Sequence, residues 1–158
     1  MRARDVLLAL LDEAFDARSW HGTNLRGSLR RIEPRQIVWR ASRHRHNIWE
    51  LVVHAAYWKY TVRRRISGEP RGSFALEGSN WFERPGAFDR RAWARDVALL
   101  VDEHQRLRAV VSEVSDATLE TRPPKSPFTI AAHKRGAAAH DLYHAGQIQL
   151  LKRLSVGR

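Results

Sequence analysis

Two histidines one helical turn apart, His140 and His144, are the residues of this sequence best placed for chemistry. They belong to a series from His133 to Leu154 that recurs at alternating steps of three and four, as one face of a helix does. Leucines at its end indicate that this face points into the core. Two imidazoles at i, i+4 have the geometry to hold one metal ion. This pattern alone is weak, because many helices carry it by chance.

A third histidine strengthens the pattern. His54 borders the apolar face of an earlier helical segment, one turn after Glu50 and one turn before Trp58. Two helices can therefore supply three imidazoles. Three neutral histidines with open positions for water suit a catalytic Zn²⁺ or Ni²⁺ ion, since structural zinc normally takes four protein ligands. Three separately hydrogen-bonded histidines remain the alternative at this point.

Two further residues are candidates for acid–base chemistry. His21 lies in a predicted loop, where functional side chains are common, and we expect it to act as a hydrogen-bond donor or base. Glu50 is the carboxylate nearest to His54 in sequence and lies on the same helix face, so it is the candidate base for a metal-activated water. His104 is expected to be a hydrogen-bonded core or pocket residue.

The other histidines are expected to lie outside the ligand set. His44 and His46 stand among arginines and are predicted to be surface residues. His133 precedes His140 by seven residues, about 10 Å along a helix, which is too far to share its metal ion.

Four long helices must position these residues. Apolar residues at helical spacing predict helices over 3–18, 47–66, 88–114 and 129–154, with Asn47 as an N-cap and Ser67-Gly68 as a helix end. A short helix is predicted over 24–32, closed by Glu33-Pro34. Residues 69–86 and 115–128 are predicted to be long connections. The pattern indicates an all-α, four-helix bundle with crossover connections, forming a single domain over residues 1–158.

The composition narrows the chemistry. The 158 residues include no cysteine, which excludes disulfides, a protein thiol nucleophile and a thiolate metal site. No apolar run is long enough for a membrane span, and the first residues do not resemble a secretory signal. We therefore expect no association with membranes and a cytoplasmic location.

The net charge of +11 raises the question whether the protein binds nucleic acid. Most of the excess lies in residues 26–65, where eleven Arg and Lys residues face only Glu33 and Glu50. However, 24 of the 28 basic residues are arginine, a bias that codon composition can produce without a binding role. Arginines 63–65 are consecutive, so they point around a helix instead of forming one reading face, and no aromatic residue interleaves with them. The sequence predicts at most weak, nonspecific binding to polyanions.

Three segments carry a resemblance to a known family: NIWELVVHAAYW (47–58), WHG (20–22) and AHDLYHAGQI (139–148). In order and separation they resemble the DinB-like superfamily of small four-helix metalloproteins. The resemblance implies a bundle with crossover connections that is often dimeric. It also implies a divalent metal held by one histidine of the second long helix and two of the fourth, which correspond to His54, His140 and His144.

The activity implied by the resemblance is less uniform than the fold. Characterised relatives include S-transferases and isomerases that use low-molecular-weight thiols such as bacillithiol, mycothiol or glutathione. The resemblance therefore implies a metal-dependent transferase that takes such a thiol and a small-molecule electrophile. A metal-dependent hydrolase and a basic binding module with a structural metal are the alternatives.

Aromatic residues near the candidate ligands are expected to form the substrate entrance. Loops rich in them can close the open end of a bundle over a ligand. Core filling is the alternative for the same residues. The expected pocket residues are Trp20, Trp58, Trp81, Phe82 and Gln147.

Overall fold

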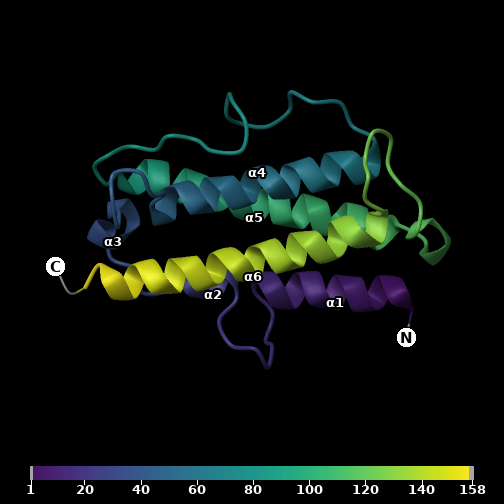
Figure 1. The fold of residues 1–158 in the computed structure, drawn as a ribbon, viewed down its shortest axis with the longest axis horizontal. Coiled ribbons are helices and arrows are strands. Elements are labelled where there is room, and N and C mark those ends of the chain that lie inside the picture. The colour runs from purple at the N-terminus through teal and green to yellow at the C-terminus, as the bar shows by residue number, and fades with distance from the viewer. Residues whose placement is uncertain (1, 157–158) are drawn as a thin grey trace.

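A computed structural model describes residues 2–156 and shows a bundle of four long helices (Figure 1). These are α1 (Ala3–Phe15), α4 (Ile48–Ser67), α5 (Arg90–Glu113) and α6 (Ile130–Leu154). The short elements are α2 (Leu25–Ser28), α3 (Pro34–Val38) and the 3-10 helix η1 (Asp116–Thr118). The described residues contain no strand, which confirms the predicted all-α bundle. None of the helices within 2–156 has the length and apolarity that a membrane crossing requires.

Long connections determine the order of the bundle. Residues 68–89 run back along the length of α4, so α4 and α5 are parallel (Figure 1). Contacts agree with this, because Trp49 of α4 bonds to Asp96 of α5, and Lys59 ten residues later lies against His104. α6 runs antiparallel to α4 and packs against both α4 and α1. The predicted crossover connection is confirmed.

Capping residues determine where the long helices begin and end. The Asn47 side chain accepts a hydrogen bond from the Glu50 amide, and the Glu50 side chain reaches back to the Asn47 amide. Gly68 ends α4 in the left-handed conformation, at φ +78°, which glycine adopts without strain. Asp89 and Thr129 cap α5 and α6 in the same way as Asn47 caps α4.

One local prediction was wrong. Glu33-Pro34 does not simply close the preceding helix: it begins α3. Proline fits the first position of a helix, where its missing amide leaves no bond unmade. Glu33 and Gln36 form a second capping box there. The helix predicted over 24–32 is shorter, with α2 ending at Ser28.

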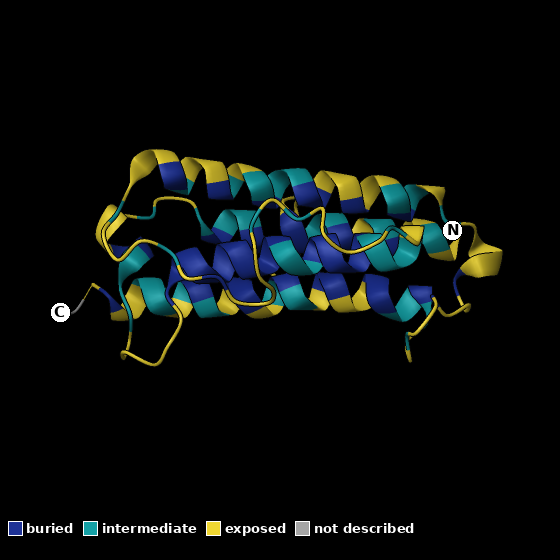
Figure 2. Ribbon diagram, turned by 90° about the horizontal axis from the view of Figure 1, so that it is seen from above, coloured by how far each residue is buried: buried dark blue, intermediate teal, exposed yellow. Residues whose placement is uncertain are grey.

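The apolar faces of the long helices meet in the core, while the connections lie outside (Figure 2). Wholly buried leucines and isoleucines come from every long helix, and each contributes about 1.5–3 kcal/mol on burial. The core also encloses polar side chains, among them His54 and His144. The fully buried apolar residues of this core include Leu11, Ile48, Leu100, Leu107 and Ile148.

Candidate metal centre

The structure brings three histidines together halfway along the bundle. His54 of α4 meets His140 and His144 of α6, and one ligand nitrogen from each lies within 4.8 Å of the others. The Nε2 atom of His140 lies 3.2 Å from Nε2 of His54 and 2.9 Å from Nε2 of His144. In a tetrahedral zinc site the nitrogens are about 3.3 Å apart, given bonds of about 2.0–2.1 Å. The cluster therefore has the dimensions of a metal centre.

Hydrogen bonds fix how two of these rings face the centre. His54 donates from Nδ1 to the backbone oxygen of Asn80 at 2.7 Å, and His144 donates from Nδ1 to Oε1 of Gln147 at 2.7 Å. Nε2 of each ring then carries a lone pair directed at His140. Two lone pairs face a ring that can offer them at most one proton. A cation shared by all three nitrogens satisfies this arrangement, so the residues fit a divalent metal.

Burial keeps the cluster neutral. Enclosure in the bundle lowers the pKa of His54 to about 4 and that of His140 to about 3. Burial also lowers the pKa of His144, although its hydrogen bond to Gln147 opposes this. Imidazole binds metal only when it is neutral, so all three nitrogens are available at neutral pH.

Trp81 and Asn80, in the connection between α4 and α5, cover the His54 side of the centre. The indole of Trp81 stacks on His54 at a centroid distance of 3.8 Å, and His46 stacks on its other face at 3.5 Å. Asn80 accepts from Nε1 of Trp58 at 2.9 Å as well as from His54. The sequence did not single out Asn80. Its only signal is that asparagine tolerates the positive φ, here 64°, that this turn requires.

Glu50 does not face the histidines. Its carboxylate accepts hydrogen bonds from Arg40 at 2.8 Å, from His46 at 3.1 Å and from the Asn47 amide. Burial by itself would raise the pKa of Glu50, but the hydrogen bonds from Arg40 and His46 lower it below its ordinary value. A carboxylate held in this way is a weak base. The structure gives Glu50 a structural role at the start of α4 instead.

Trp20 and His21 are not brought to the centre either. Both are exposed, Trp20 to 94%, in the loop between α1 and α2. That loop borders the last turns of α6 near Gln149 and Lys152, on the side of α6 away from α4 (Figure 1). No contact joins either residue to the three histidines within the described chain. Trp20 and His21 therefore lie in solvent on the opposite side of α6 from the predicted pocket.

The remaining predicted pocket residues have three different surroundings. Trp58 and Trp81 lie against the histidines, at the positions described above. Phe82 is instead core filler, buried with Ile37 and Trp49. Gln147 orients His144 and is not among the residues that line the pocket beside His140.

The other buried histidines have separate partners. His104 stacks on Phe15 at 3.6 Å, and its Nδ1 lies 3.3 Å from the Lys59 ammonium. His133 is hydrogen-bonded to Ser126 at 2.8 Å and lies outside the cluster. His46 is exposed, as predicted, but its stacking on Trp81 makes it a neighbour of the site.

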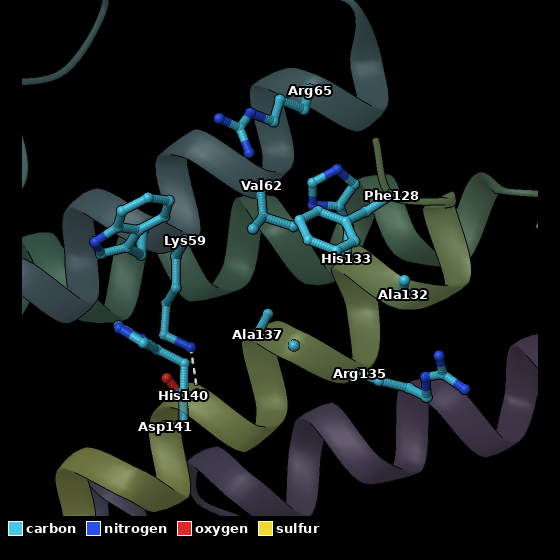
Figure 3. Close-up of a pocket in the computed structure, with 12 residues that line it drawn as sticks. Lys59, Val62, Arg65, Phe128, Ala132, His133, Arg135, Ala137, His140 and Asp141 are labelled. Carbon is cyan, nitrogen blue, oxygen red and sulfur yellow. Dashed lines mark hydrogen bonds and ion pairs between the residues drawn. The ribbon is translucent and has the colours of Figure 1, made fainter. Parts of the chain in front are cut away.

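A pocket of about 450 Å³ adjoins the centre between α4 and α6 (Figure 3). Trp58 and His140 form its end nearest the other two histidines. Pockets of this size enclose small organic molecules. Of the three histidines, His140 lies in the wall of this pocket.

Fold and site together define an all-helical protein with a three-histidine candidate metal centre beside a pocket. The chain belongs to the DinB superfamily, whose sequence model matches residues 2–148. No curated protein and no solved structure matches it significantly. The match confirms the family indicated by the sequence motifs.

Proposed function

We propose that this protein is a divalent-metal-dependent transferase that joins a low-molecular-weight thiol to a small electrophile. The observation that carries the proposal is the convergence of three neutral imidazoles beside a pocket, with no fourth His, Asp or Glu ligand in the cluster among residues 2–156. Three protein ligands leave coordination positions open for a reactant. Zinc and nickel both suit this set of nitrogen ligands.

The roles of the residues follow from their contacts. His54, His140 and His144 would hold the cation, with His54 oriented by Asn80 and His144 by Gln147. A divalent cation bound there lowers the pKa of a thiol presented to it. Trp58 and Trp81 shield the histidines from solvent. Because the chain has no cysteine, the thiol must arrive as a cosubstrate.

The proposed reaction is a substitution at carbon. The sulfur of the cosubstrate forms the new carbon–sulfur bond, and the leaving group departs with the electron pair of the bond that breaks. The thiol proton passes to solvent. The chain supplies orientation and exclusion of water, and the family resemblance adds the expectation of a homodimer.

The test begins with metal-stripped protein reloaded with Zn²⁺ or Ni²⁺. Glutathione, bacillithiol and mycothiol are each offered with a chlorodinitrobenzene, an alkyl halide and an epoxide, and thioether formation is followed. We expect thiol-dependent turnover that needs the metal and is lost in His140→Ala together with bound metal. His133→Ala, on the same helix but outside the cluster, is the matched control for metal content and keeps the bound metal. Unchanged metal content in the Ala variants of all three cluster histidines would refute the assignment.

The alternatives receive less support from the structure. Hydrolysis needs a base for the attacking water, and Glu50 is held by Arg40 and His46 instead. A basic binding module needs free cations, and ion pairs with carboxylates reduce their number in 26–65, where four of the eleven basic residues are paired. These four are Arg35, Arg40, Lys59 and Arg63.

A further inference from the structure

The pocket beside His140 extends along the seam between α4 and α6, away from the metal centre (Figure 3). Trp58 lines it near the centre, and Arg65 lines it seven residues further along α4. At the helical rise this separation is about 10 Å. The pocket is therefore long enough for an extended molecule with two different ends.

Most of its wall is apolar. Val62 and Ala137 face it from the two helices, and Phe128, which is 58% exposed, lies at the end away from the centre. Gly136 contributes no side chain, and a Cβ atom built there meets nothing within 4 Å. The apolar part of this wall can accept a hydrocarbon or aromatic body, and the polar residues Lys59, Asp141 and His133 in the lining already have partners.

The charges along the pocket are unequal. Lys59 and Asp141 form a buried ion pair at 2.5 Å and neutralise one another. Arg65 makes no ion pair with any carboxylate in residues 2–156. Its side chain extends along α4 toward the end that holds Lys59, whereas Arg135 points away from α4 (Figure 3). One half-buried, unpaired guanidinium therefore faces the ligand space.

We infer that this pocket binds an apolar organic acid, with its carboxylate at Arg65 and its other end at the three histidines. A guanidinium pairs with a carboxylate through two parallel hydrogen bonds, and the apolar wall accounts for the body. The inference rests on the proposed function in one respect: the end of the acid that lies at the histidines would be the electrophile of the transfer. Binding of the acid itself does not need the metal.

Isothermal titration calorimetry with metal-free protein tests the binding. Decanoate is the probe, and decanamide is its uncharged counterpart. We expect decanoate to bind at least about tenfold more tightly, because only its carboxylate can form a charge-assisted pair with the guanidinium of Arg65. Arg65→Gln should remove this preference and leave the affinity for decanamide unchanged.

Arg64→Gln is the matched control. It removes the same charge from the adjacent position, but Arg64 lines a different pocket and lies near the Glu69 backbone oxygen. It should keep the preference for decanoate. Equal losses in the two variants would show general charge attraction and overturn the inference.

Gly136→Leu tests the position of the body. Leucine favours the helix and fills the pocket, so both ligands should be lost while the thermal midpoint stays the same or rises. Binding that survives this change overturns the inference. So does a wild-type protein that binds neither probe and whose sedimentation shifts from dimer to monomer in Gly136→Leu, because a second copy of the chain then covers the pocket.

The two proposals fail in different ways. Arg65-dependent decanoate binding without any thiol transfer overturns the proposed function alone. Thiol transfer with no preference for carboxylate-bearing electrophiles, unchanged in Arg65→Gln, overturns the inference alone.

Discussion

Stability should fall between pH 7.5 and pH 5 because of a histidine outside the metal centre. His104 is 4% exposed and lies between the ring of Phe15 and the ammonium of Lys59. Burial, followed by the nearby positive charges of Lys59 and Arg108, lowers its pKa from 6.5 to about 3. The folded protein therefore keeps His104 neutral at pH 5, whereas the unfolded chain binds a proton there.

The size of the effect follows from linkage. Since the unfolded state binds more protons below pH 6.5, stability is full above that value and is lost as the pH falls. At pH 5 the unfolded histidine lies 1.5 pH units below its pKa of 6.5, and the folded one remains unprotonated. At about 1.36 kcal/mol per unit, His104 alone lowers the free energy of unfolding by about 2 kcal/mol.

Urea unfolding of the wild type and His104→Gln, both metal-free, measures this contribution. Glutamine cannot take up the proton, so the cost of the substitution should be smaller by about 2 kcal/mol at pH 5 than at pH 7.5. His21→Gln, a histidine substitution in an exposed loop, is measured at the same two pH values as the control. A cost for His104→Gln that does not change with pH would refute the assigned burial.

Further predictions concern the connection, the exposed loop and the charge. Asn80→Gly should keep metal content, since glycine adopts the positive φ and retains the oxygen that orients His54, whereas Asn80→Val should cost about 1–3 kcal/mol and lower metal affinity. His21→Ala and Trp20→Ala should leave metal content, turnover and thermal midpoint unchanged, as assays of the loaded protein would show. Binding of duplex DNA, measured by fluorescence anisotropy, should be weak and fade between about 50 and 200 mM salt; sequence-selective binding at physiological salt would contradict this.

The long helices could be read from the sequence because local signals mark them. Apolar residues at helical spacing define their faces, and Asn47, Gly68 and Thr129 mark ends at which backbone groups need partners. Helical spacing alone left open whether His54 meets His140 and His144, and the family resemblance favoured the shared site that the structure shows.

The coverage of the centre could not be read in this way. Trp81 was expected near the candidate ligands, but Asn80 lies in the same connection, where no periodicity indicates which side chains turn inward. His46 was placed on the surface from its arginine neighbours, and it is exposed, yet its ring completes a stack over His54 through Trp81. Such contacts depend on the path of the whole loop from Gly68 to Asp89.

Glu50 shows the limit of reasoning from helical spacing. Its position four residues before His54 places both on one face, but a residue in the first turn of a helix also stands beside unpaired backbone amides. The carboxylate of Glu50 accepts hydrogen bonds from the Asn47 amide, Arg40 and His46, and not from His54. Within residues 2–156 the centre therefore has three neutral nitrogens and no carboxylate in the cluster. That donor set favours a reaction in which the cation itself promotes loss of the proton from a thiol over one that needs a protein base.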